Sequence, residues 1–324
     1  MMPKMQKLTF LDASTMACEG DLDLKVLARF GHLELHPLSA PEEVPGRLSG
    51  GTTIAFANKA IVGSDAMDAA RDTLRLIVVC ATGTNNIDLD AARERGLAVC
   101  NVSGYSAPSV AQHVFALLLN LATQCHRYAA ETEAWAASPI FTRLDYPVIE
   151  LAGKTLGIVG LGAIGRAVAR IGEGFGMKVQ TLRREGSPAA PGFPRLPARE
   201  FFETSDVITL HCPLTVENER MINVESLGWM KPTAFFINTG RGGLVDEAAL
   251  LTALKNRSIA GAGLDVLTVE PPPADHPLIR ARLPNLLITP HSAWTSREAR
   301  QRMLDIIVEN VRVFLDGGSL NRVV

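Results

Sequence analysis

A glycine-rich loop between an apolar strand and a helical pattern constrains the fold of this chain more than any other sequence feature. Gly160, Gly162 and Gly165 form a G-x-G-x-x-G segment at the end of the apolar run 155–160. Gly160 permits a tight turn, Gly162 lets the backbone approach a pyrophosphate, and Gly165 allows a helix to pack closely on the strand. The N-terminus of that helix offers N–H groups to the phosphates. The segment predicts a dinucleotide-binding domain, and a structural turn that binds nothing is the alternative.

Strand-like runs alternate with helical patterns along the whole chain, which is typical of parallel sheets built from βαβ units. The predicted strands are residues 8–11, 33–38, 52–57, 76–81, 98–102, 155–160, 178–182, 207–212, 233–238, 263–267 and 286–289. Among the predicted helices are residues 21–30, 88–95, 110–135 and 295–315. The apolar helix 110–135 is expected to pack between two domains, and the last helix to return to the first domain.

We therefore predict an α/β fold with two domains. Residues 103–293 would form a Rossmann-type, doubly wound parallel sheet that binds the dinucleotide. Residues 1–102 together with 294–324 would form a smaller, flavodoxin-like α/β substrate domain, which makes that domain discontinuous. A chain of 324 residues with 47% hydrophobic side chains can supply a core for each domain.

The charge and cysteine content exclude several classes of function. With 32 basic and 34 acidic side chains, the chain has no overall field that would attract nucleic acid or a membrane surface. Its longest near-apolar stretch, residues 114–122, is too short to span a bilayer. The 5 cysteines are scattered without a C-x-x-C pair, which favours free thiols over disulfides or a metal site. We expect a cytoplasmic protein without a bound metal, nucleic acid or membrane partner.

Three polar residues each follow a predicted strand of the second domain. Arg241, Glu270 and His291 come just after the runs 233–238, 263–267 and 286–289. Because the carboxyl ends of parallel strands open onto the ligand crevice, we expect the three side chains to meet there. Together they would form an anion anchor and an acid/base pair. The alternatives are a surface arginine, a solvated carboxylate and a packed histidine.

The end of the second strand of this domain bears on the cofactor. A carboxylate at that position accepts hydrogen bonds from the ribose of NAD, whereas this chain has Arg183 and Arg184. Guanidinium groups bind a 2′-phosphate through paired hydrogen bonds, whereas a carboxylate would repel it. The sequence favours NADP(H), with NAD(H) as the alternative if both arginines are merely solvated.

Seven stretches of the chain carry a family resemblance: residues 83–88, 101–113, 153–165, 211–215, 237–247, 261–266 and 289–294. On these motifs the chain resembles the D-isomer-specific 2-hydroxyacid dehydrogenases, and within them the glycerate dehydrogenase or hydroxypyruvate reductase type. The resemblance covers nearly the whole chain. The arginine pair departs from the acidic residue usual in NAD-dependent members.

The resemblance implies a role for each residue of the predicted site. Arg241 would bind the substrate carboxylate, His291 would donate a proton to the 2-keto oxygen, and Glu270 would orient and tune His291. The backbone of Thr82 and Gly83 would also bind that carboxylate, and Trp294 would border a small substrate pocket. His211 is expected to shape the cofactor wall. The further cofactor residues would be Ala163, Ile164, Cys212, Pro213, Thr239, Gly240 and Asp265. A homodimer is implied as well.

The resemblance makes hydroxypyruvate and glyoxylate the first candidate substrates. A dehydrogenase for another small acid, such as D-lactate or phosphite, is the rival within the class. A dinucleotide-sensing scaffold without catalysis, like the C-terminal-binding corepressors, is the rival from a different class. The sequence does not distinguish the physiological keto acid or the direction of the reaction.

Overall fold

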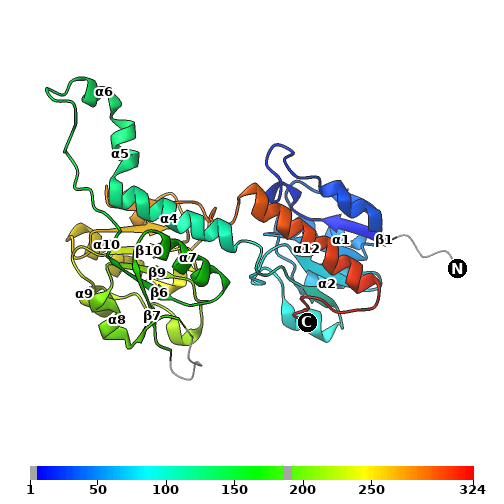
Figure 1. Ribbon diagram of the computed structural model, residues 1–324. Helices are drawn as coiled ribbons and strands as arrows, with labels where there is room; N and C mark the ends of the chain where they lie inside the picture. The colour runs from blue at the N-terminus through cyan, green and yellow to red at the C-terminus, as the bar shows by residue number, and fades with distance from the viewer. Residues whose placement is uncertain (1–5, 185–191) are drawn as a thin grey trace. The chain divides into compact units, whose positions relative to one another are not determined.

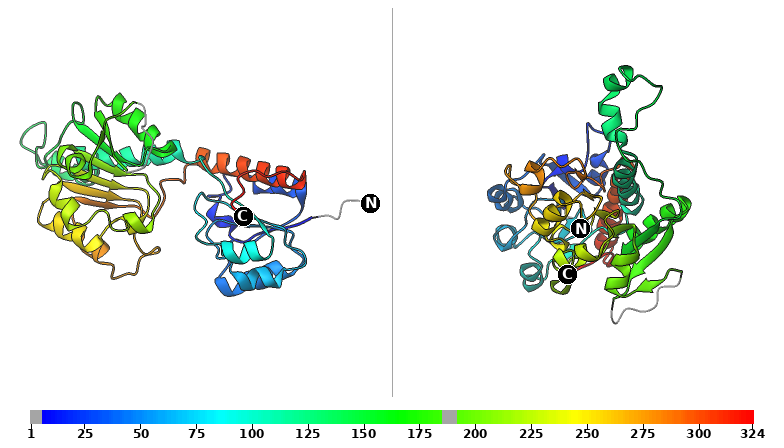
Figure 2. Two further views of the ribbon diagram at one scale, coloured as in Figure 1. Left: turned by 90° about the horizontal axis from the view of Figure 1, so that it is seen from below. Right: turned by 90° about the vertical axis from the view of Figure 1, so that its left-hand side faces the viewer.

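The computed structural model describes residues 6–184 and 192–324. The chain divides into two compact units. One contains residues 1–106 and 295–324, and the other contains residues 107–294. Figures 1 and 2 show that each unit is a sheet with helices on both faces. The α/β class predicted from the alternation is confirmed.

The first unit is built on a five-stranded parallel sheet of order β2-β1-β3-β4-β5. This is the flavodoxin-like order. The strands are β1 (Gln6–Phe10), β2 (Gly31–Leu35), β3 (Ile54–Ala57), β4 (Leu76–Val79) and β5 (Ala98–Cys100). The α-helices are α1 (Val44–Ser49), α2 (Ser64–Ala69), α3 (Leu89–Glu94) and α12 (Arg297–Leu315). The 3-10 helices are η1 (Ala13–Thr15), η2 (Leu24–Phe30) and η3 (Pro41–Glu43). Strands β3 and β4 are buried along their whole length, which explains their unbroken apolar runs.

The second unit is built on a seven-stranded parallel sheet of order β12-β11-β10-β9-β6-β7-β8. The strands are β6 (Thr155–Val159), β7 (Lys178–Leu182), β8 (Arg195–Leu196), β9 (Val207–Leu210), β10 (Phe235–Asn238), β11 (Gly261–Leu264) and β12 (Leu286–Ile288). Chain order runs outward from β6 to β7 and β8, then resumes on the other side at β9. This is the Rossmann order, and its reversal between β6 and β9 marks the ligand crevice.

Helices cover both faces of the second sheet and bury a separate apolar cluster on each. Helices α4 (Ala107–Thr123) and α7 (Ala163–Gly174) enclose one cluster, which includes Val114, Leu118 and Val168. Helices α8 (Ala198–Thr204), α9 (Val224–Trp229) and α10 (Glu247–Lys255) enclose the other. The remaining elements of this unit are α5 (Cys125–Ala130), α6 (Thr132–Ala136), α11 (Pro277–Arg280), η4 (Val216–Asn218) and η5 (Gly242–Leu244).

Two predicted helices are wrong in part. The helix predicted over 110–135 is interrupted, because Gln124 adopts the left-handed conformation with φ of 53° and ends α4 at Thr123. Helices α5 and α6 follow as separate short turns that extend away from the sheet of the unit (Figure 1). The segment predicted as a helix over 21–30 is the 3-10 helix η2, which begins after Asp23, whose carboxylate accepts a hydrogen bond from the Lys25 amide.

Strand β11 differs from its prediction in position rather than in kind. The prediction placed it at 263–267, whereas it spans Gly261–Leu264. A Cβ at Gly263 would lie 2.9 Å from the Leu117 Cβ of α4, so the strand needs a glycine where the helix crosses it. Because glycine is depleted in strands, the start of this strand carries a weak sequence signal.

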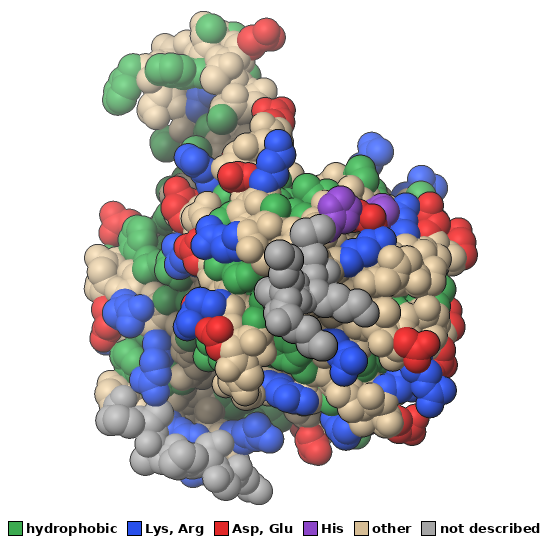
Figure 3. All heavy atoms as spheres, turned by 90° about the vertical axis from the view of Figure 1, so that its right-hand side faces the viewer, with side chains coloured by type: hydrophobic (Ala, Val, Ile, Leu, Met, Phe, Trp, Pro, Cys, Tyr) green, Lys and Arg blue, Asp and Glu red, His purple; other side chains and the backbone are tan. Residues whose placement is uncertain are grey.

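Acidic and basic side chains are interspersed on the face drawn in Figure 3. This distribution agrees with the small net charge of -2. Within residues 6–184 and 192–324, no helix is both long and apolar enough to cross a membrane.

Candidate active site

The glycine loop follows β6 at the point where the strand order reverses. Gly160 has φ of 97°, and a Cβ there would lie 2.7 Å from the backbone of His211 and Cys212. A Cβ at Gly165 would approach the Gly160 carbonyl oxygen well inside 3.0 Å. At Gly162, by contrast, a Cβ would meet no atom within 4 Å. The loop is therefore tight on its inner side and open at Gly162.

Helix α7 begins at Ala163 directly above this opening. Its N-cap is Gly162, and no side chain caps its first N–H groups. The first turn of a helix has N–H groups without intrahelical partners and carries a partial positive charge. The open backbone at Gly162 and the uncapped amides from Ala163 onward fit a dinucleotide pyrophosphate.

The wall opposite the loop is formed by residues after β9 and β10. Burial lowers the pKa of His211 to about 3, so its ring is neutral at physiological pH, and Nε2 lies 2.9 Å from Thr209 Oγ1. His211 Nδ1 and Thr239 Oγ1 are buried without a hydrogen-bond partner among the described residues. Buried polar atoms are rarely left unpaired, so these two fit a site that receives a polar ligand. Cys212, Pro213 and Gly240 adjoin them in sequence.

Arg183 and Arg184 follow β7 and are exposed. A hydrogen bond from Thr215 and, to a smaller extent, the charge of Arg184 lower the pKa of Glu217. Arg184 thus lies near the loop that follows Cys212. Burial raises the pKa of Cys212, and the charge of Arg184 offsets part of this rise.

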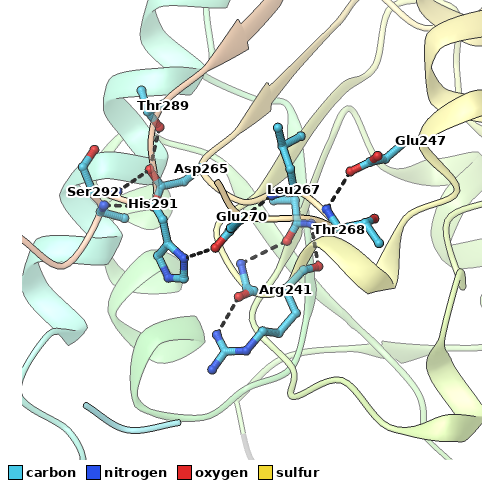
Figure 4. Close-up of polar contacts among 12 residues, drawn as sticks. Arg241, Glu247, Asp265, Leu267, Thr268, Glu270, Thr289, His291 and Ser292 are labelled. Atoms are coloured by element: carbon cyan, nitrogen blue, oxygen red, sulfur yellow. Dashed lines mark hydrogen bonds and ion pairs between the residues drawn. The ribbon is translucent and has the colours of Figure 1, made fainter. Parts of the chain in front are cut away.

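Arg241, Glu270 and His291 lie side by side at the carboxyl ends of β10, β11 and β12 (Figure 4). His291 Nδ1 is 2.6 Å from Glu270 Oε2, and each of the two side chains is about one third exposed, at 34% and 35%. Because the carboxylate accepts, Nδ1 carries a proton, and Nε2 is the ring atom left to exchange one. Arg241 is exposed and donates from Nη1 to the Gly240 carbonyl at 2.8 Å.

Hydrogen bonds from polar side chains hold the three loops that carry these residues. Asn238, fully buried at the end of β10, donates to the Arg241 carbonyl and accepts from the Gly240 amide. Glu270 accepts at Oε1 from the Leu267 amide at 2.9 Å. Glu247 accepts from the Thr268 amide at 2.8 Å and lies 3.1 Å from His276 Nε2.

Asp265 holds the loop of His291. It is 1% exposed, and its two carboxylate oxygens accept from Thr289 Oγ1 and from the amides of Ser292 and Ala293. The Asp265 carbonyl accepts from the His291 amide at 2.8 Å. The predicted place of Asp265 beside the nicotinamide stays a prediction. Sequence reasoning missed the holding residues Glu247, His276 and Thr289, although Glu247 and Thr289 lie in the family motifs that it quoted.

The predicted substrate residues outside the three loops are only partly placed. Thr82 follows β4 in the first unit, where its hydroxyl donates to the Val102 carbonyl and its own carbonyl accepts from Asn101. Trp294 is the last residue of the second unit and is partly buried. Because Thr82 and Gly83 belong to the first unit, their contact with the substrate of Arg241 stays a prediction.

The fold and the site together define a class of protein. The protein has a Rossmann sheet with an open glycine loop, and beside it a cation and an imidazole bound to a carboxylate. These features are typical of a dinucleotide-dependent oxidoreductase that acts on acidic substrates. Residues 115–293 match the family model described as D-isomer specific 2-hydroxyacid dehydrogenase, NAD binding domain. The chain belongs to the D-isomer-specific 2-hydroxyacid dehydrogenases, as the motifs predicted. It is an NAD(P)-dependent enzyme that acts on the CH–OH group of its donors.

Similar proteins cover nearly the whole chain. It is 43% identical to a glycerate dehydrogenase from Methylorubrum extorquens, over 87% of this chain and 88% of that one. It is 37% identical to a hydroxypyruvate reductase from Blautia hydrogenotrophica, over 93% and 95%. The structure of an NADPH-dependent glyoxylate/hydroxypyruvate reductase from Sinorhizobium meliloti, in complex with NADP and malonate, matches with a TM-score of 0.83. That match has 27% identity and covers 99% of this chain and 97% of that chain.

Proposed function

We propose that the enzyme reduces a small 2-keto acid to the D-2-hydroxy acid, with hydroxypyruvate or glyoxylate as substrate. The observation that carries this proposal is the 2.6 Å pair of His291 Nδ1 and Glu270 Oε2 beside the exposed guanidinium of Arg241. A cation of fixed charge suits the carboxylate of a keto acid, and a paired imidazole suits the proton that its reduction consumes. The relatives reported above act on acids of this size.

In this proposal Arg241 binds the substrate carboxylate through two parallel hydrogen bonds and polarises the 2-keto oxygen. A bound, reduced nicotinamide would supply the hydride that C2 of the keto acid needs. His291 donates its Nε2 proton to the carbonyl oxygen, so the C=O bond becomes a CH–OH group. Glu270 holds the proton on Nδ1 and stabilises the imidazolium before the transfer. In the oxidation direction, His291 accepts the hydroxyl proton.

The proposed cofactor is NADP(H). The support is the pair Arg183 and Arg184, which follow β7 at the place where NAD sites typically have a carboxylate. Residues 160–165 would hold the pyrophosphate, and Cys212, Pro213, Thr239 and Gly240 would adjoin the nicotinamide and ribose. NAD(H) is the alternative, in line with the description of the family model.

A panel of keto acids with both cofactors tests the substrate and the cofactor in one experiment. We expect kcat/KM for hydroxypyruvate or glyoxylate to exceed that for pyruvate by at least about tenfold. In a small pocket, one contact with the substrate side chain gained or lost changes the free energy of transition-state binding by about 1–3 kcal/mol. We also expect kcat/KM measured with NADPH to exceed kcat/KM measured with NADH. Turnover of pyruvate or oxidation of phosphite without turnover of the first two acids would replace the substrate proposal. An equal or higher kcat/KM with NADH would replace the cofactor proposal.

We further propose a homodimer formed by the second unit. Its arm, residues 125–150, exposes Phe141 to 90%, Leu144 to 85%, and Trp135 and Ile140 to more than half. Figure 3 shows hydrophobic side chains, in green, on the projection at the top of the view. A groove of about 650 Å³ on α4 and α7 is lined by Pro108, Ala111, Phe115, Leu119, Ala167 and Ile171. An apolar arm and an apolar groove in one chain suit a symmetric pair of copies.

Light scattering after size exclusion tests the dimer. The wild-type chain of 34.8 kDa is expected to elute at twice that mass. Phe141→Asp should shift it toward monomer, since a buried unpaired charge costs several kcal/mol at an interface while an exposed one costs nothing in the monomer. Val216→Asp is the matched control, because Val216 is also 90% exposed but lies outside the arm. A monomeric wild type, or a Phe141→Asp variant that stays dimeric, would contradict the proposal.

A further inference from the structure

A histidine of α4 joins the group of side chains behind the loop of His291. His113 Nε2 lies 2.9 Å from Thr289 Oγ1 and 3.4 Å from Asp265 Oδ1. Thr289 Oγ1 is itself 2.6 Å from the same Asp265 oxygen. Thus His113 from α4, Asp265 after β11 and Thr289 after β12 form one hydrogen-bonded group. Thr289 of this group lies in the same loop as His291, which pairs with Glu270.

The hydrogen-bond geometry assigns the protons in this group. The Asp265 carboxylate only accepts, and the hydroxyl of Thr289 has one proton to give. The 2.6 Å bond directs that proton to Asp265, so Thr289 accepts from His113. His113 Nε2 must then carry a proton. Its 3.4 Å distance to Asp265 agrees, because a donor can face both acceptors whereas an unprotonated nitrogen would face a negative charge.

What this group holds is the backbone that directs His291. Asp265 accepts from the amides of Ser292 and Ala293 at 2.9 Å each, and its carbonyl accepts from the His291 amide. His291 has φ of 51°, in the left-handed region that is uncommon for residues with a Cβ. Such a conformation persists only where the surroundings over-determine it. Here Asp265 binds the amides on both sides of the turn, and the hydrogen bonds of Thr289 and His113 fix the Asp265 carboxylate.

We propose that His113 is a positioning residue of the active site, which acts through Thr289 and Asp265 to fix the direction of the His291 imidazole. The inference rests on the proposed role of His291 as proton donor. Misplacing a reacting group by about 1 Å can cost about 10²-fold in rate, so a loosened turn would lower kcat while the glycine loop and Arg241, the proposed sites for the pyrophosphate and the substrate carboxylate, stay unchanged.

Replacing His113 tests the proposal through the split between kcat and KM. In His113→Leu we expect kcat for keto-acid reduction to fall about 10- to 100-fold, with KM for the keto acid within about threefold. The dissociation constant of NADPH, from fluorescence titration, should stay within about twofold. His113→Gln, which keeps an N–H donor at a similar reach, should recover most of kcat. A purely structural role for His113 would not predict this recovery.

Thr289→Val removes the other partner of the hydrogen bond between His113 and Thr289. It also tests the proposal if His113→Leu does not fold. It should lower kcat by a similar factor, and the double variant should be no worse than the poorer single variant, because both changes break one chain of contacts. Thr123→Val is the matched control, since the Thr123 hydroxyl donates to the Leu119 carbonyl and accepts from the Cys125 amide, neither of which belongs to the loop of His291. In spectra of ¹⁵N-labelled protein without cofactor, the His291 imidazole signal should shift in His113→Leu and Thr289→Val but not in Thr123→Val.

Two outcomes would overturn the inference: unchanged kcat in both His113→Leu and Thr289→Val, or an equal loss in His113→Gln and His113→Leu with an unshifted His291 signal. Failure of the proposed function gives a different result. If His291→Gln keeps full turnover, the proton-donor role fails whatever the His113 variants do. If His291→Gln is inactive while the His113 variants are not, only the positioning role fails.

Discussion

His291→Gln is expected to lower kcat for keto-acid reduction by about 10² to 10⁴-fold, the contribution typical of a general acid. Gln preserves the approximate size of the ring and a hydrogen bond to Glu270 but cannot supply a proton. The dissociation constant for NADPH should stay within about twofold, because His291 follows β12, whereas the glycine loop follows β6. Stopped-flow measurement of the hydride-transfer step and fluorescence titration of the cofactor give the two quantities.

His32→Gln is the matched control for this substitution. His32 is 63% exposed on β2 of the first unit, so the same chemical change there should leave kcat unaltered. The kcat of Glu270→Gln should lie between those of His291→Gln and His32→Gln. The amide oxygen of Gln can still accept from Nδ1 of His291 but carries no charge to stabilise the imidazolium. A His291→Gln enzyme with more than about one tenth of the wild-type kcat would exclude His291 as the proton donor.

The architecture could be predicted from the sequence because its strong signals are local. Buried parallel strands such as β3 and β4 are short unbroken apolar runs, and the glycine loop marks the first strand of the nucleotide-binding sheet. The doubly wound topology then follows from right-handed crossovers between parallel strands. The two-residue strand β8 was not predicted, because so short a run carries no periodic signal. Errors appeared where a single backbone dihedral angle decides the structure, as at Gln124, whose left-handed conformation breaks the helix.

The residues that hold the site were harder to predict than the site itself. Arg241, Glu270 and His291 follow strands, so topology alone brings them to the same edge of the sheet. Asp265, Thr289 and His113 act through hydrogen bonds that join positions 24 and 176 residues apart along the chain. No periodicity or spacing encodes such pairings. Asp265 shows the difference: its place on the cofactor side stays a prediction from its motif, and that motif gave no indication that its carboxylate bonds to Thr289, Ser292 and Ala293.

Gly165→Ala should nearly abolish dinucleotide binding, and it should do so by damaging the loop. The added methyl group would approach the Gly160 carbonyl oxygen well inside 3.0 Å, and that oxygen belongs to backbone that cannot rotate away. Either α7 or the end of β6 must move, which would misplace the amides that face the pyrophosphate. We expect at least about a 100-fold rise in the NADPH dissociation constant, together with a melting temperature lowered by several degrees, as overpacking costs about 1–3 kcal/mol.

Gly162→Ala distinguishes a direct clash with the bound dinucleotide from damage to the glycine loop. Because a Cβ at Gly162 meets no atom within 4 Å, the melting temperature without cofactor should not change. If the pyrophosphate crosses this opening, the methyl group must occupy its space, and the NADPH dissociation constant should rise by at least about tenfold, or 1.4 kcal/mol. Gly174→Ala, at the exposed end of α7 with equally open surroundings, is the control and should leave binding unchanged. Unaltered binding in Gly162→Ala would mean that the dinucleotide does not pass over Gly162. Lowered stability without cofactor would mean instead that the opening is already filled by the chain.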